Sequence, residues 1–168
     1  MNPPKPVKRR RWADATANEK ILSVSTLSGY RGTVGDPKGA QYDFLLDVPD
    51  EALGQAVLDC LARSRFLDTP ELRAELYPVE AVLSDARAWT ERLMAFGAYK
   101  TKSALFRRMM KVSIEEEDGK LTFSPWHHVR SDSWDEGQLT AADNVLASME
   151  DPPAALGAAL RVALGRCT

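Results

Sequence analysis

The sequence predicts a single domain of the α/β (α+β) class, with helices packed on a small, mainly antiparallel sheet. The chain has 168 residues, which is the usual size of one domain with a core of its own. Hydrophobic residues make up 44% and charged residues 27%, a composition typical of globular proteins. Short alternating segments stand beside longer stretches with helical spacing of apolar residues, and this mixture indicates both kinds of element.

The first twelve residues are predicted to form a flexible basic tail, and residues 13–168 the folded domain. The tail contains three prolines and five basic residues, so it has no face to bury. The Ser-, Thr- and Val-rich segment 21–30 follows as a predicted strand. A glycine cluster from Gly29 to Gly39 then predicts a loop or wide turn, and Tyr42–Leu46 predicts a second short strand.

Three helices and a short fourth are predicted in the middle of the chain. The first runs from about Asp50 to Phe66, and the second begins at Thr69, with Pro70 at its first helical position. The third opens at Pro78 and ends at Gly97 in a left-handed cap. Its predicted buried face consists of Val82, Ala86, Trp89, Leu93 and Phe96. Thr101 is predicted to cap the short helix.

The clearest local pattern is a β-hairpin around Asp118-Gly119. Lys111–Glu117 and Lys120–Pro125 alternate apolar and polar residues, and Asp-Gly favours a two-residue type I′ turn. Pro125 should end the ladder or place the second strand at an edge. Residues 126–138 are predicted to be an irregular loop, residues 143–148 fit either helix or strand, and Asp151-Pro152 starts a final helix that stops at Gly165.

The charge distribution favours a basic protein partner over nucleic acid. Five of the 22 basic residues lie in the tail, while all 24 acidic residues lie after it. An acidic body has few Lys and Arg side chains for phosphate contacts, so nucleic acid is not expected to bind directly. The tail lacks the apolar residues of a membrane anchor, no apolar run is long enough to cross a membrane, and no secretory signal is present, so a cytoplasmic protein is expected.

The sequence favours a binding protein, not an enzyme, with no metal and no cofactor. His127 and His128 are adjacent, and neighbouring side chains on an extended segment point to opposite faces, so the two cannot readily share one metal ion. Cys60 lies on the apolar side of a helix, where a thiol is usually inert. No nucleophile elbow and no zinc-protease motif are present.

An alternative is a regulatory or small-ligand-binding module that uses the Gly29–Gly39 loop. Backbone N–H groups of glycine-rich loops can bind anions. The loop lacks the spacing of dinucleotide and P-loop motifs, and no clear helix follows it, which favours a connecting turn. A deep polar pocket lined by Arg31 and Lys38 would favour this alternative.

The back third of the chain resembles the immunity proteins (CdiI) of bacterial contact-dependent growth inhibition (CDI) systems. The resemblance rests on Thr101–Met109, on the hairpin ending at Pro125, and on the closing segment through Leu156 to Cys167, with Gly29–Gly32 added from the front half. It implies a small cytoplasmic α/β protein that binds the CdiA-CT type toxin domain of its own system, 1:1, and blocks it without catalysis. Such toxins are frequently nucleases, often acting on transfer RNA. The resemblance supplies no catalytic or toxin-contact residues.

Two acidic clusters are predicted to meet the basic groove of such a toxin, where carboxylates would take the places of phosphates. Trp126 or Trp134 would add an apolar anchor, because Trp is enriched among interface hot spots. An edge strand protected by charge, and a core Trp entering from a loop, are the structural alternatives. The predicted partner-binding residues are Glu115, Glu116, Glu117, Asp118, Trp126, Asp132, Trp134, Asp135 and Glu136.

Overall fold

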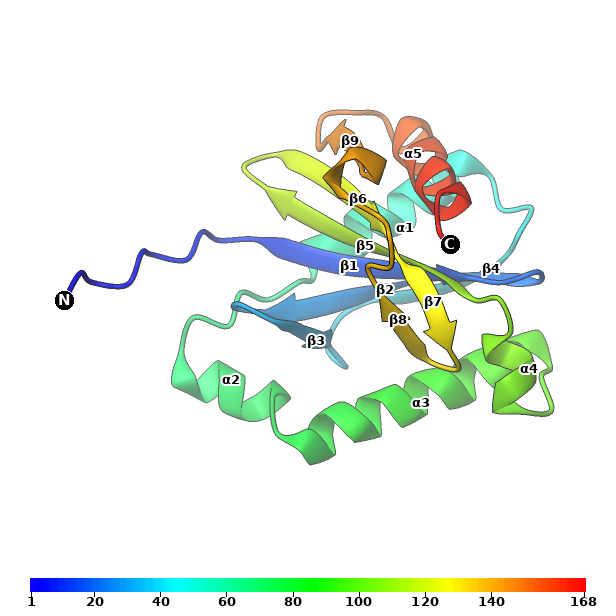
Figure 1. Ribbon diagram of the computed structural model, residues 1–168, viewed down its shortest axis with the longest axis horizontal. Helices are drawn as coiled ribbons and strands as arrows, with labels where there is room; N and C mark the ends of the chain where they lie inside the picture. The colour runs from blue at the N-terminus through cyan, green and yellow to red at the C-terminus, as the bar shows by residue number, and fades with distance from the viewer.

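A computed structural model describes all residues from 1 to 168 and contains five α-helices and nine strands (Figure 1). The strands are β1 (Arg11–Ala17), β2 (Ile21–Gly29), β3 (Thr33–Gly35), β4 (Gln41–Leu45), β5 (Met110–Glu117), β6 (Lys120–Pro125), β7 (His127–Arg130), β8 (Ser133–Asp135) and β9 (Val145–Ser148). The helices are α1 (Asp50–Ala62), α2 (Pro70–Leu76), α3 (Val79–Gly97), α4 (Lys102–Phe106), α5 (Pro153–Gly165) and a 3₁₀ turn (Ala141–Asp143).

The main sheet has seven strands and is antiparallel at every pairing of named strands. Its order is β3-β2-β1-β5-β6-β9, and β4 pairs with β2 next to β3. β7 and β8 form a separate two-stranded sheet. The predicted α+β class with a mainly antiparallel sheet in one domain is therefore confirmed.

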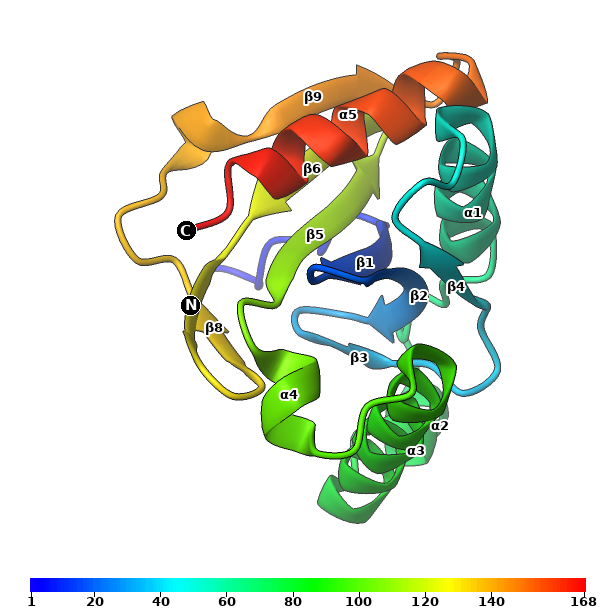
Figure 2. The same cartoon turned by 90° about the vertical axis from the view of Figure 1, so that its right-hand side faces the viewer.

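The main core lies between the sheet and the helix pair α1 and α5 (Figure 2). Alternation along β1 places Ala13, Ala15 and Ala17 on this face, and Val112 and Ile114 of β5 join them. The apolar spacing of the last helix predicts a buried stripe of Leu156, Ala159, Leu160, Ala163 and Leu164, and all of these are buried except Ala159, which is half-buried. α1 and α5 cross closely because each has a glycine at the contact: a Cβ on Gly54 would collide with the backbone of Pro153, and one on Gly157 with the backbone of Asp50.

α3 lies on the other side of the sheet from α1 and α5 (Figure 1). Its predicted buried face is wrong for most of the helix: the buried residues are Thr90, Leu93 and Gly97, while Ala86 and Phe96 are exposed. The left-handed cap is at Ala98, one residue after the predicted Gly97. Gly97 is instead required by packing, because a Cβ there would collide with the ring of Tyr99.

The predicted hairpin is confirmed in register and in turn type. Glu117 pairs with Lys120, and both Asp118 and Gly119 have positive φ angles, 52° and 81°, as a type I′ turn requires. The ladder with β5 ends at Pro125, as expected. The ambiguous segment 143–148 contains the short strand β9, which pairs with the outer side of β6.

The boundary between tail and domain was predicted two residues too late. β1 begins at Arg11, and Trp12 is buried, so the end of the predicted tail lies in the centre of the sheet. The strand was missed because its inward residues are alanines, which give a weak strand signal. The predicted irregular loop 126–138 is also wrong in part, since it contains the hairpin of β7 and β8.

Candidate functional site

The face of the sheet that points away from α1 and α5 is polar. Because alternate residues of a strand point to opposite faces, the alanines of β1 fix Asp14 and Thr16 on this second face. Asp14 lies between Ser25 of β2 and Ser113 of β5, and Thr16 lies between Ser23 and Lys111. The fold therefore places a patch of hydroxyl and charged side chains across the middle of its sheet.

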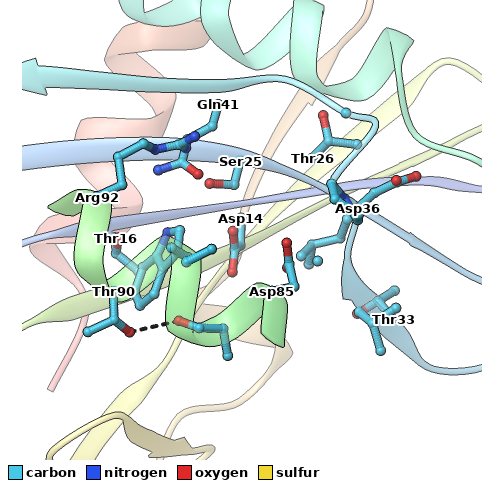
Figure 3. Close-up of a pocket in the computed structure, with 18 of the residues that line it drawn as sticks. Asp14, Thr16, Ser25, Thr26, Thr33, Asp36, Gln41, Asp85, Thr90 and Arg92 are labelled. Carbon is cyan, nitrogen blue, oxygen red and sulfur yellow. Dashed lines mark hydrogen bonds between the residues drawn. The ribbon is translucent and has the colours of Figure 1, made fainter. Parts of the chain in front are cut away.

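α3 covers this polar face incompletely and leaves a cavity. The C-terminal half of the helix is held by a small apolar cluster in which Leu93 packs with Ile21, Leu105, Phe106 and Met109. The N-terminal half has no such anchor, and Val79 and Leu83 are exposed there. Between α3 and strands β1 and β2 lies a cavity of about 610 Å³, called here the sheet cavity (Figure 3).

The side chains lining the sheet cavity carry an excess of negative charge. The carboxylates are Asp14, Asp36, Asp85 and Asp132, and the cations are Arg92 and Lys111. Asp36 is paired with Arg65 from outside the cavity, and Arg92 is paired with Asp43 at 3.4 Å. Lys111 lies 3.7 Å from Asp14, while Asp85 and Asp132 have no ion-pair partner. Two carboxylates thus remain uncompensated.

Burial makes the ionised forms of Asp14 and Asp85 costly. Burial raises the pKa of Asp14 above its usual value, and the ammonium of Lys111 only partly offsets this, while the charge of Asp85 adds to it. Burial also raises the pKa of Asp85, the neighbouring charge of Asp36 acts in the same direction, and the charge of Arg92 offsets this only in part. Figure 3 shows the two carboxylates on facing walls, Asp14 from β1 and Asp85 from α3. The cavity is therefore suited to receive a positively charged group.

The hairpin of β7 and β8 places Trp134 at the border of the sheet cavity. The indole Nε1 donates a hydrogen bond to the carbonyl of Met109 at 2.9 Å. One side of the ring contacts Phe106 and the imidazole of His128 stacks on it, with centroids 6.3 and 5.4 Å away. The ammonium of Lys111 lies 5.3 Å from the ring centroid. Trp134 is thus a partly exposed aromatic beside an acidic cavity, fixed by contacts on several sides.

A second cavity of about 550 Å³ lies on the same face of the sheet. Leu27 and Thr33 line both cavities, so the two adjoin each other. The second cavity holds Trp126, whose Nε1 donates to the hydroxyl of Ser113 at 2.7 Å. Glu136 lines it from the loop after β8. Both predicted Trp anchors therefore border the polar face of the sheet, and neither is a fully buried core residue.

The first predicted acidic cluster is paired within the chain. The basic tail runs beside the hairpin. The carboxylate of Glu117 forms ion pairs with the ammonium of Lys8, at 3.0 Å, and with the guanidinium of Arg10. The remaining contacts are Arg10 to Glu115 (3.7 Å), Arg11 to Glu116 (4.0 Å), Lys8 to Asp118 (3.5 Å) and Trp12 Nε1 to Glu115 (3.0 Å). The expectation that these four carboxylates are free for a partner is corrected, because the tail was assumed to be flexible and unattached.

The second predicted acidic cluster is exposed. Asp132, Asp135 and Glu136 are all exposed, and none takes part in an ion pair. Asp135 accepts a hydrogen bond from the backbone N–H of Gly137, which fixes the turn after β8. Asp132 and Trp134 line the sheet cavity, and Glu136 lines the second cavity. Their role in binding a partner stays a prediction.

The Gly29–Gly39 loop contributes Thr33–Pro37 and Gly39 to the lining of the sheet cavity, but neither cavity is lined by both Arg31 and Lys38, as the alternative function requires. Arg31 lines the second cavity, while Lys38 lines neither cavity and pairs with Glu75 at 2.7 Å. The carboxylate of Asp36 is fully buried and accepts bonds from Ser28 and Arg65. These contacts hold the loop as a structural connection that carries β3.

Known proteins resemble this chain over almost its whole length. A model of the family "CDI immunity protein" (CdiI) matches residues 11–167. The immunity protein CdiI-YPIII of Yersinia pseudotuberculosis serotype O:3 (strain YPIII) is 36% identical over 167 residues, covering 93% of this chain and 94% of that protein. The chain belongs to the CDI immunity protein family.

Two solved structures share the fold of this CDI immunity protein. A chain of a CdiA-CT/CdiI toxin and immunity complex from Yersinia pseudotuberculosis superposes with a TM-score of 0.90 and 34% identity, covering 97% of this chain and all of that one. A protein of unknown function from Neisseria meningitidis superposes with a TM-score of 0.86 and 34% identity, covering 97% and 98%. The family model begins at Arg11, so the first ten residues lie outside the matched region.

Two further features of this CDI immunity protein bear on its chemistry. No group of three or more His, Cys, Asp or Glu side chains is arranged to hold a metal ion. None of the helices combines the length and the hydropathy that crossing a membrane requires.

The sequence did not reveal the residues that form the floor and lid of the sheet cavity in this CDI immunity protein. These residues come from three separate segments of the chain and match no motif: Asp14 from β1, Lys111 from β5, and Asp85, Trp89 and Arg92 from α3. One signal was available for Asp14. It is a charged residue between alanines on a strand buried on its other face, which is unusual unless that charge faces a polar cavity.

Proposed function

We propose that this CDI immunity protein binds the CdiA-CT type toxin domain of its own system and neutralises it, as a 1:1 complex in the cytoplasm. The observation that supports this is the 0.90 TM-score, at 34% identity, to a chain from a CdiA-CT/CdiI toxin and immunity complex. Inhibition is stoichiometric and needs no reaction by the immunity protein itself.

The toxin that fits this surface is a nuclease, of the kind that cleaves transfer RNA. A nuclease needs basic side chains around its substrate groove, because it binds a phosphate backbone. An inhibitor can occupy such a groove by presenting carboxylates where phosphates would lie, and opposite charges also speed the encounter. Access of substrate to the active site is then blocked by the bound immunity protein.

The polar face of the sheet is the docking surface, centred on the sheet cavity. Asp85 and Asp132 are its uncompensated carboxylates, and Asp135 and Glu136 extend the negative charge along the adjacent hairpin. Trp134 supplies an aromatic surface that is already fixed by its hydrogen bond to Met109, so little conformational entropy is lost when a partner packs on it. A lysine or arginine side chain of the toxin would enter the cavity and meet Asp85.

The experiment is charge reversal on the exposed hairpin. We expect Asp132→Lys, Asp135→Lys and Glu136→Lys together to abolish protection of cells that express the adjacent toxin fragment, and to prevent its co-elution. The matched control reverses Asp47, Glu71 and Glu91, which are also exposed and without ion pairs, so the net charge changes equally. Wild-type protection by the hairpin variant would overturn this docking surface. Nuclease activity of the purified toxin, and its loss on adding one equivalent of wild-type protein, tests the substrate class.

A further inference from the structure

The first ten residues are held to the domain almost entirely by charge. None of them takes part in a backbone hydrogen bond, and the sheet ladder begins only at Arg11. Lys8 and Arg10 instead reach the carboxylate of Glu117, and the guanidinium of Arg9 lies 5.9 Å from the ring of Phe66. We call residues 1–10 the arm. Exposed ion pairs of this kind are individually weak and are screened by salt, so the contact is readily released.

The arm and the hairpin match in spacing as well as in charge. Lys8 and Arg10 are two residues apart on an extended segment that leads into β1, so both side chains point to the same face. Glu115 and Glu117 are likewise two apart on β5, and Arg10 contacts both. The hairpin surface of Glu115–Asp118, which we call the hairpin patch, therefore already holds an extended basic segment.

The arm lies outside the residues that the family model matches. The family model starts at Arg11, the first residue of β1, and the arm adds nothing to the sheet or to the core. It does, however, cover carboxylates that would otherwise be open to a basic partner. Apart from the contact of Arg9 with Phe66, the ion pairs of the arm all go to this one patch, so the arm is suited to controlling access to it.

We propose that the arm is an intramolecular competitor that occupies the hairpin patch until a basic, extended segment of a partner displaces it. The occupant of the opened patch is a peptide segment with Lys or Arg at alternate positions, as in the arm itself. That the partner is the toxin rests on the proposed function, but the competition for the patch does not. Association with such a partner is slowed by the arm and accelerated when the arm is weakened.

The first test needs no toxin. The probe is a labelled synthetic peptide with the sequence of residues 1–10, and its binding to the full chain is measured by fluorescence anisotropy at low salt. We expect the Lys8→Gln, Arg10→Gln variant to bind the peptide about 3- to 10-fold more tightly than wild type, because its own arm competes less. The matched control is Lys100→Gln, Lys102→Gln, which removes two exposed charges outside the arm that form no ion pair and should match wild type.

Two further variants test whether the peptide binds at the hairpin patch. Adding Glu115→Gln and Glu117→Gln to the weakened-arm variant should abolish peptide binding, whereas adding Glu91→Gln and Glu71→Gln, with the same charge change elsewhere, should leave it intact. Equal binding by the wild-type and weakened-arm chains would overturn the proposal. Peptide binding that survives the loss of both hairpin carboxylates would overturn it as well.

The second test uses the toxin fragment. Its association rate with the weakened-arm variant should exceed the wild-type rate about 3- to 10-fold at low salt, and the difference should vanish at high salt. A lower rate would show that the arm itself binds the toxin, and would overturn the proposal. If the peptide results hold but no variant binds the toxin, the proposed function fails and the competition stands.

Discussion

The ammonium of Lys111 lies 3.7 Å from a carboxylate oxygen of Asp14, and this is the only ion pair between two residues that line the sheet cavity. Lys111 is shared, because its ammonium also lies over the ring of Trp134. The pair compensates one buried carboxylate, whereas Asp85 on the facing wall has no ion pair and is only partly offset by the more distant charge of Arg92. The cavity therefore keeps a net negative charge that a basic side chain of a partner can neutralise.

Asp85→Asn should weaken toxin binding without weakening the fold. The carboxylate makes no hydrogen bond or ion pair, so its replacement by a neutral amide removes a charge whose burial cost exceeds the attraction of the more distant Arg92. The free energy of unfolding at neutral pH should stay unchanged or rise by up to about 1 kcal/mol. Affinity for the toxin, measured by calorimetry, should fall about tenfold. Asp47→Asn is the control, and a variant that binds like wild type would remove Asp85 from the interface.

The difference in unfolding free energy between wild type and Asp85→Asn should depend on pH. Because burial raises the pKa of Asp85, the folded state binds this proton more readily than the unfolded state. The cost of the charge is therefore present at neutral pH and is lost as the pH falls through the raised pKa toward the unfolded value of about 3.9. Urea unfolding of wild type and Asp85→Asn at several pH values should show the wild type gaining relative stability as the pH falls. A constant difference would contradict the assignment.

Gly157→Ala should destabilise the domain strongly, because α1 and α5 approach through glycine. The added methyl group would collide with the backbone oxygen of Asp50, and backbone atoms cannot move aside as a flexible side chain can. A loss of about 2–3 kcal/mol in the free energy of unfolding is expected. Gly165→Ala is the control in the same helix, since nothing lies within 4 Å of its Cβ position, and it should change stability by less than about 0.5 kcal/mol. Similar effects at both positions would contradict the close helix crossing.

The two cysteines should differ in reactivity. Burial raises the pKa of Cys60 to about 12, and its thiol lies fully inside the core. Burial also raises the pKa of Cys167, but this side chain is only partly buried. Iodoacetamide at pH 8 should therefore modify Cys167 first, with Cys60 reacting only after denaturant is added, as followed by mass spectrometry. Modification of Cys60 before denaturant is added would contradict the prediction, because it requires the core beside α1 to open in the folded protein.

Local patterns in the sequence were sufficient for much of the fold. The Asp118-Gly119 turn, the caps at Thr69 and Thr101 and the apolar stripe of α5 each follow from neighbours in the chain, and each is present. The strand β1 was missed because its inward alanines have low strand propensity, and only pairing with both β2 and β5 stabilises it.

The candidate site was harder to predict because it depends on packing between distant segments. The apolar residues expected on one face of α3, from Val82 to Phe96, predict a helix that packs on the sheet along its whole length. Between Asp85 and Arg92 the helix instead leaves a space above strands β1 and β2, and this space is the sheet cavity. Asp132 and Trp134 were identified from composition alone, whereas Asp14 and Asp85 meet only through the tertiary fold. The pairing of the arm with the hairpin patch is equally non-local, which is why those carboxylates were expected to be free.

The most direct test of the docking surface is hydrogen–deuterium exchange of the full chain, alone and saturated with its toxin fragment. We expect slower exchange on binding in the segments that surround the sheet cavity, namely 14–27, 81–92 and 131–137, with little change in α1 and α5. Protection confined to α1 and α5, with unchanged exchange around the cavity, would contradict it.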